Sequence, residues 1–279
     1  MTSFLKSRAR RVRVGRGRPS RFYGQEPSTL EGKLDLVGLA DAAKSLETLI
    51  GEAAQNNLSH RDFLDCLIER ELAWRHGKKV ERLVHSAKFP VIKTIDGFDW
   101  NHPTSIPKAM ILNALKFDFV EKKEHLIFLG PGGVGKSHLT LAIGYAACQK
   151  EIPVLFTTVA DMINDLVAAQ ADHSLKRVLT KYIRPRLLLL DELGYLPLDE
   201  QGRNLFFQVI SKRAQTGSVV LTTNKPFKNW NEVFQDTAVA TAIAERLVEN
   251  GELIKIEGPS YRVKKRRARQ LGFEEPENK

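Results

Sequence analysis

A glycine-rich turn lies in this sequence between an apolar segment and a helical one, and it limits the folds that the chain can adopt. Residues 130–137 read Gly-Pro-Gly-Gly-Val-Gly-Lys-Ser. Glycines let the backbone wrap closely around a ligand, and the amides of such a turn, together with the N-terminus of the next helix, carry partial positive charge. This spacing, after a strand and before a helix, is the P-loop pattern that binds nucleotide phosphates.

The side chains of this turn have distinct expected roles. We expect Lys136 to reach the β- and γ-phosphates of ATP, and Ser137 to ligate Mg2+. A glycine-rich turn without a ligand is the alternative. The expected nucleotide-binding residues are Gly130, Pro131, Gly132, Gly133, Val134, Gly135, Lys136, Ser137 and His138.

A second element is an apolar run that ends in two acids, Leu-Leu-Leu-Leu-Asp-Glu at residues 187–192. Such a run predicts a buried strand whose end delivers both acids to the carboxyl edge of a sheet, where ligands bind in open α/β folds. We expect Asp191 to hold Mg2+ directly or through water, and Glu192 to orient and deprotonate the attacking water. The run is common by itself, but together with the P-loop it predicts hydrolysis of ATP.

A third apolar run, residues 219–223, ends at Asn224. On a strand beside the acids, this amide would position the water near the γ-phosphate; alternatively, it caps the following turn. The pair Asn224-Lys225 also occurs in proteins that read guanine. Phe227 stands where those proteins place an acid, so a guanine-specific site is disfavoured.

The pattern of apolar residues predicts two kinds of architecture in one chain. Apolar residues at helical spacing over residues 30–88 predict a small all-helical domain, and short apolar runs alternating with helices after residue 104 predict an α/β domain with a parallel sheet covered on both faces. The expected strands are residues 125–130, 154–159, 187–191, 218–223 and 253–257. The expected organisation is a basic disordered arm (1–28), a helical domain (29–88), a connector (89–103), the ATPase domain (104–258) and a tail (259–279).

The net charge of +10 is concentrated near the two ends of the sequence. Residues 1–30 hold eight basic residues and one acid, and a second basic run lies between residues 262 and 269. Such runs indicate a polyanionic partner, most often nucleic acid, although solvated tails are the alternative. The first 20 residues are also Arg- and Ser-rich without an acid, as in a mitochondrial transit peptide. No apolar run approaches the roughly 18 residues of a membrane span, and two cysteines without metal-type spacing favour a reducing cytosol.

Taken together, these motifs resemble the IstB-like ATP-binding proteins, the AAA+ helpers of bacterial insertion-sequence transposases, which are related to the helicase loader DnaC and the initiator DnaA. The resemblance covers roughly residues 30–263. Beyond the P-loop, it is carried by residues 63–75, 88–90, 94–100, 190–195 and 260–262.

The resemblance implies an AAA+ P-loop domain behind a small helical domain, with residues 94–100 near the adenine. It also places Arg246, within Ala-Glu-Arg-Leu, where related ATPases carry an arginine finger that reaches the γ-phosphate of a neighbouring subunit. A surface arginine paired with Glu245 or Glu249 is the alternative for this residue.

The function implied by the resemblance is that of a DNA-stimulated ATPase of the bacterial cytoplasm. Such a protein forms homo-oligomers through ATP at subunit interfaces, assembles on double-stranded DNA and delivers that DNA to a transposase. A replicative helicase loader of the DnaC type shares the same motifs and is the closest competing function. The sequence is also compatible with a DNA-bridging protein that uses ATP only structurally, and with an organellar ATPase that carries a transit peptide.

Overall fold

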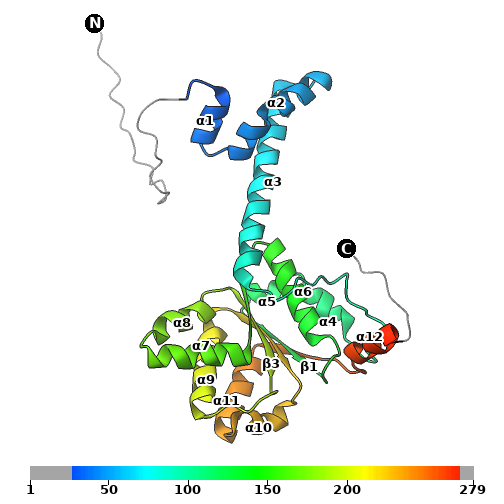
Figure 1. Cartoon of the computed structure of the whole chain (residues 1–279), viewed down its shortest axis with the longest axis vertical. Coiled ribbons are helices and arrows are strands. Elements are labelled where there is room, and N and C mark those ends of the chain that lie inside the picture. Colours follow the sequence, from blue (N-terminus) through cyan, green and yellow to red (C-terminus); the bar gives the residue numbers. More distant parts are fainter. Residues whose placement is uncertain (1–26, 271–279) are drawn as a thin grey trace. The chain divides into compact units, whose positions relative to one another are not determined.

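A computed structural model of the chain describes residues 27–270 (Figure 1). The expectations for residues 1–26 and 271–279 therefore lie outside the described residues. The chain divides into two compact units, and the boundary between Arg75 and His76 lies inside helix α3 (His60–Ala87). The expected domain limits at residues 88 and 104 remain predictions.

The first unit contains α1 (Leu30–Leu36), α2 (Ala40–Gln55) and the beginning of α3. Its small core joins Ala42 and Leu46 of α2 to Leu67 of α3. The carboxylate of Glu71, only 2% exposed, accepts hydrogen bonds from the backbone amides of Asp41 (2.9 Å) and Ala42 (3.1 Å) at the start of α2. This buried acid therefore satisfies amides that have no partner within their own helix.

The second unit is built on five parallel strands in the order β2-β3-β4-β1-β5. This confirms the predicted α/β fold with a parallel sheet. β3 runs two residues beyond the predicted end, and β5 begins two residues before the predicted start. The strands are β1 (His125–Leu129), β2 (Val154–Thr158), β3 (Leu187–Leu193), β4 (Ser218–Thr223) and β5 (Gly251–Lys255).

Helices connect these strands and cover both faces of the sheet (Figure 1). Before and after β1 they are α4 (Lys108–Ala114), α5 (Asp118–Glu121) and α6 (Lys136–Gln149). Between β2 and β4 they are α7 (Val159–Ala171), α8 (Leu175–Ile183) and α9 (Glu200–Thr216). The remaining helices are η1 (Phe227–Asn229), α10 (Trp230–Phe234), α11 (Thr237–Val248) and α12 (Tyr261–Gln270).

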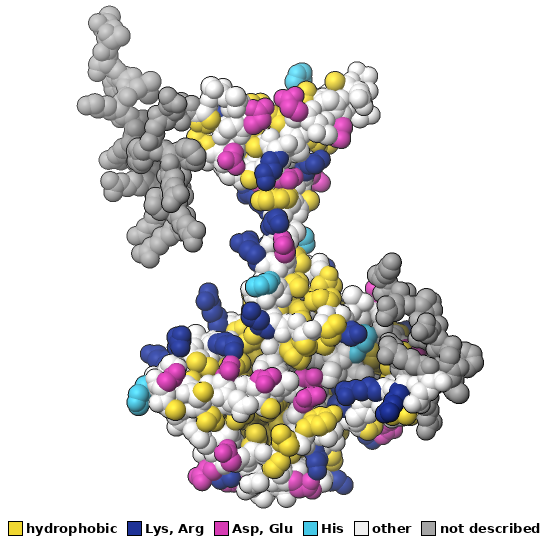
Figure 2. Space-filling model, viewed as in Figure 1, with side chains coloured by type: hydrophobic (Ala, Val, Ile, Leu, Met, Phe, Trp, Pro, Cys, Tyr) yellow, Lys and Arg dark blue, Asp and Glu magenta, His cyan; other side chains and the backbone are white. Residues whose placement is uncertain are grey.

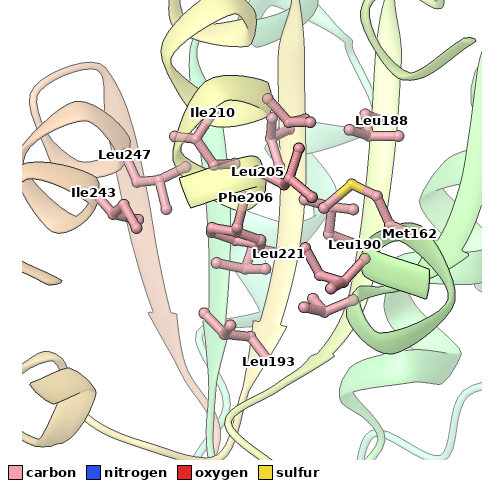
Figure 3. Close-up of a cluster of buried hydrophobic side chains, with 14 of the residues drawn as sticks. Met162, Leu188, Leu190, Leu193, Leu205, Phe206, Ile210, Leu221, Ile243 and Leu247 are labelled. Atoms are coloured by element: carbon pink, nitrogen blue, oxygen red, sulfur yellow. The ribbon is translucent and has the colours of Figure 1, made fainter. Parts of the chain in front are cut away.

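The central strands β1, β3 and β4 are buried on both faces, and successive residues enter different cores. Leu189 of β3 packs in the core that contains α4 and α6. Leu188 and Leu190 pack instead in the core formed with α7, α9 and α11, where Figure 3 shows Phe206 and Leu247 closing over the strands. Burial on both faces explains why the β3 sequence has no polar alternation before Asp191.

Two further expectations concern the membrane and the cysteines. Within residues 27–270, no helix has the length and apolar character needed to span a membrane. Both cysteines are free; Cys66 is exposed, and Cys148 is buried in the α6 core, where burial raises the pKa of its thiol to about 11. Cys148 therefore packs as a small hydrophobic residue.

Candidate nucleotide-binding and hydrolysis site

The glycine-rich turn connects β1 directly to α6, as the P-loop pattern requires. Gly133 (φ +83°) and Gly135 (φ +102°) adopt left-handed backbone conformations that favour glycine. Space is also limiting, since a Cβ on Gly135 would lie 2.5 Å from the ring of Phe98 and one on Gly133 would lie 2.1 Å from the Ser260 hydroxyl. A side chain at either position would therefore distort the turn.

Lys136 begins α6 and is 5% exposed. Its ammonium donates hydrogen bonds to the carbonyls of Gly130 (2.7 Å) and Pro131 (2.8 Å) of the same turn. Burial lowers the pKa of Lys136 to about 8; the carboxylates of Asp191 and Glu192 oppose this change, and the guanidinium of Arg262 adds to it. The turn thus holds a desolvated cation that an anionic ligand would stabilise.

Ser137 and Asp191 meet at the carboxyl edge of the sheet. The Ser137 hydroxyl donates to Oδ1 of Asp191 at 3.0 Å, across 54 positions in the sequence. Asp191 is 5% exposed, and its Oδ1 also accepts a hydrogen bond from the Thr222 hydroxyl of β4. The structure therefore brings the two predicted metal ligands together beside Lys136.

Glu192 follows Asp191 in an unusual backbone conformation. Its φ is +70°, and its side chain is exposed at the edge of the sheet. The pairing of β3 with β4 is interrupted between Leu190 and Leu193, so that Glu192 lies in a β-bulge. The expected general base is thus adjacent to the metal ligands and accessible to solvent.

A cavity of about 330 Å³ opens above the turn. Besides Gly133 to His138, its lining includes Phe98 and Asp99 from the connector, Tyr195 from the loop after β3, and Tyr261 and Arg262 of α12. His138 donates from Nε2 to the Thr94 carbonyl (2.9 Å), and its ring lies edge-on to Phe98 with centroids 5.4 Å apart. Aromatic groups thus line the cavity beside the phosphate-binding turn, as a nucleotide with a base and a phosphate chain requires.

The start of α12 completes this cavity from a distant part of the sequence. The Tyr261 amide donates to the Gly133 carbonyl at 2.9 Å, and the Tyr261 ring lies edge-on to His102 with centroids 4.9 Å apart. The resemblance singled out residues 260–262 as a motif but gave them no role. No local pattern indicated that Tyr261 and Arg262 face the phosphate-binding turn.

Asn224 follows β4, and its side chain is half-buried. Its Oδ1 is buried without a hydrogen-bond partner among the described residues, and it lies 3.0 Å from the position of a Cβ on Gly194. Water positioning and turn capping both remain predictions for Asn224.

Arg246 lies on α11, away from the cavity of its own chain. Its Nη1 donates to the Ala242 carbonyl at 2.8 Å, and its guanidinium carbon lies 4.6 Å from the ring centroid of Phe207 on α9. Among the described residues, no ion pair joins Arg246 to Glu245 or Glu249, although both acids border the same surface hollow. Arg246 is half-buried, with its guanidinium against the Phe207 ring beside this hollow.

These residues fit ATP and Mg2+ on their chemistry. The hydroxyl of Ser137 and the carboxylate of Asp191 are the hard oxygen ligands that Mg2+ prefers, and they already lie within hydrogen-bonding distance of each other. The turn supplies backbone amides, a helix N-terminus and a buried ammonium for the phosphates.

Comparison with known proteins agrees with this geometry. The family model described as IstB-like ATP binding protein matches residues 29–269. An insertion sequence IS21 putative ATP-binding protein of Pseudomonas aeruginosa is 35% identical, with 85% of this chain and 90% of that protein covered. The corresponding IS232 protein of Bacillus thuringiensis subsp. berliner is 37% identical, covering 84% of this chain and 94% of that protein.

Solved structures show the same fold at lower sequence identity. AMPPCP-bound DnaA from Aquifex aeolicus superimposes with a TM-score of 0.52 at 19% identity, covering 66% of this chain and 57% of that chain. At this identity the likeness shows the fold alone, an AAA+ P-loop fold. The match across residues 29–269 and the identity of the insertion-sequence relatives establish the family, and this chain belongs to the IstB-like ATP-binding proteins.

Proposed function

We propose that this chain is a magnesium-dependent ATPase that assembles on double-stranded DNA and delivers it to a transposase. The observation that carries the hydrolytic part is the contact between Ser137 and Asp191, 3.0 Å apart, with buried Lys136 beside them and Glu192 next in the chain. In this proposal, the residues for phosphate binding, metal binding and general-base catalysis share one edge of the sheet.

Each residue has one task in this proposal. Lys136 neutralises charge on the β- and γ-phosphates, and Ser137 and Asp191 hold Mg2+, which supplies further neutralisation when bound. Glu192 takes a proton from the water that attacks the γ-phosphorus, and the bond to the oxygen bridging the β- and γ-phosphates breaks. Asn224 orients that water from the end of β4.

Exchange of Glu192 for glutamine separates binding from hydrolysis. Glu192→Gln keeps the shape of the side chain and removes the base, so ATP affinity should remain within about threefold while turnover falls by about 100-fold or more. Phosphate release and ATP-analogue titration measure the two quantities. Glu252→Gln, at an exposed position of β5, is the matched control and should retain wild-type turnover. Near-normal phosphate release by Glu192→Gln would exclude the assigned role.

The position of Arg246 supports a proposal of assembly through ATP. Its guanidinium packs on Phe207 beside a surface hollow, so we propose that it enters the nucleotide site of a neighbouring copy and stabilises the transition state there. Bound ATP would then join subunits, and hydrolysis would release them.

DNA binding is supported by basic residues on the surface of the second unit. Helix α8 buries Leu179 and Tyr182 and exposes Lys176 and Arg177, and its C-cap residue Arg184 is also exposed. Figure 2 shows Lys and Arg side chains gathered over the region that Figure 1 labels α8. Rows of exposed cations neutralise phosphates without reading bases, so we propose binding to duplex DNA with little sequence preference and stimulation of hydrolysis by that DNA.

The transposase as partner, and the bacterial cytoplasm as location, are proposed from the relatives, whose names place them in insertion sequences. The helicase loader is the competing function, because it requires the same ATPase site. The deciding experiment is affinity capture on this chain, with and without ATP. A purified transposase from the same insertion sequence and a purified replicative helicase are tested separately for retention. Retention of the helicase alone would overturn the transposition role.

A further inference from the structure

The β-bulge in β3 places two acids opposite a single residue of β4. Leu190 pairs with Leu221, and the next pair joins Leu193 to Thr223. Asp191 and Glu192 therefore both face Thr222, which is 1% exposed. A bulge of this kind changes which way the following side chains point, and bulges are frequent beside active sites.

The packing of β3 reveals the effect of this extra residue. Leu188, Leu190 and Leu193 all enter the core formed with α7, α9 and α11. In a regular strand, residues 190 and 193 would point to opposite faces, because side chains alternate with a period of two. The bulge accommodates one extra residue at Glu192, which is the expected general base.

The hydroxyl of Thr222 connects both acids. It donates a hydrogen bond to Oδ1 of Asp191, the same oxygen that accepts from Ser137, and it accepts a hydrogen bond of 2.9 Å from the backbone amide of Glu192. That amide has left the regular strand ladder, and burial without a partner would be unfavourable. One hydroxyl thus orients the Asp191 carboxylate and holds the backbone of Glu192 at its positive φ of +70°.

We propose that Thr222 is a positioning residue for hydrolysis, which fixes the metal-binding acid and the general base relative to each other without touching the nucleotide. This inference rests on the proposed ATPase function. A valine at this position keeps the shape and removes the hydroxyl, so Asp191 loses a donor and the Glu192 amide loses its acceptor. A serine keeps both hydrogen bonds.

The first measurement is steady-state hydrolysis combined with nucleotide binding. Thr222→Val should lower kcat about 10- to 100-fold, the effect expected for lost hydrogen bonds to a charged group, while the affinity for an ATP analogue changes less than about threefold. Thr222→Ser should restore kcat to within about threefold. The matched control is Thr223→Val, since Thr223 is equally buried but bonds to Lys225 instead of the acids, and it should leave kcat near wild type.

The second measurement is hydrogen–deuterium exchange in the nucleotide-free protein, which needs no activity. In Thr222→Val the Glu192 amide should exchange at least about tenfold faster, visible as one additional deuteron on a peptide covering residues 190–196. Thr222→Ser and Thr223→Val should leave that peptide unchanged. If valine prevents folding, Thr222→Ala provides the same test with a smaller side chain.

The results separate the inference from the function beneath it. Wild-type turnover in Thr222→Val, or unchanged exchange at Glu192, would overturn the role of Thr222 while leaving the ATPase intact. Absence of hydrolysis in the wild-type protein with DNA would overturn the proposed function, and the exchange experiment would still decide whether Thr222 holds the bulge. A further check is the double variant Thr222→Val/Glu192→Gln, whose fold-loss in kcat should be smaller than the product of the two single fold-losses, because part of the effect of the hydroxyl acts through Glu192.

Discussion

The buried ammonium of Lys136 predicts a specific pH dependence of ATP binding. Burial lowers the pKa of this side chain to about 8 in the nucleotide-free protein, with Asp191 and Glu192 opposing the change and Arg262 adding to it. Phosphate oxygens interact favourably only with the charged form. ATP affinity should therefore be fully present below pH 8 and should fall about tenfold for each pH unit above it.

The magnitude follows from the protonated fraction of Lys136. With a pKa of about 8, that fraction falls about 25-fold between pH 7.5 and pH 9.5, which corresponds to about 2 kcal/mol of binding free energy. A lysine at its ordinary pKa of about 10.4 would lose only about a tenth of its charge over the same interval. The phosphates of ATP are already ionised throughout this range, because their last pKa lies near 6.

Fluorescence titration of an ATP analogue at four pH values between 7.5 and 9.5 measures the effect. Arg262→Gln is the informative variant, since loss of the neighbouring positive charge should move the decline in affinity to higher pH. Melting curves of the nucleotide-free protein at each pH confirm that folding is not limiting. An affinity that changes less than about twofold over the whole range would refute the assignment of a desolvated, phosphate-binding ammonium to Lys136.

Two further predictions concern assembly and DNA. Arg246→Ala protein should still bind ATP but should hydrolyse it poorly. Mixing it with Lys136→Ala protein should restore turnover at interfaces that combine an intact Lys136 with an intact Arg246. A mixture that assembles together but stays inactive would contradict action between subunits. Fluorescence anisotropy across a salt series should show tighter duplex binding with ATP and Mg2+, and deletion of residues 1–28 should lower the affinity and reduce the salt slope by about 0.9 for each phosphate contact removed. An unchanged slope would mean that the basic arm is a solvated tail and that DNA binds elsewhere, with α8 the first surface to test.

The parts of the fold that sequence predicted are those that depend on local patterns. The four leucines of residues 187–190 needed only their own apolar character to indicate a buried strand, and the P-loop needed only its glycine spacing before a helix. The proximity of Ser137 and Asp191 could also be predicted from the sequence, because parallel strands present their carboxyl ends at one edge of the sheet.

The parts that sequence did not predict depend on partners far along the chain. The bulge at Glu192 arises from the register of β3 on β4, which places Thr222 opposite two residues, and a flat strand ending at Asp191 was equally compatible with the sequence. The stacking of Arg246 on Phe207 likewise requires α9 and α11 to pack together. In both cases the sequence shows which residues are present, but their geometry depends on contacts that the sequence alone does not predict.

The hydrogen bond from the Tyr261 amide to the Gly133 carbonyl joins the P-loop to a segment that is synthesised much later. Synthesis proceeds from the N-terminus, and domains fold as their segments emerge. The P-loop leaves the ribosome long before β5, which pairs with β1, and before Tyr261 and Arg262, which line the cavity. The cavity is therefore complete only after α12 has been synthesised, so a nucleotide can make all of its contacts only late in translation.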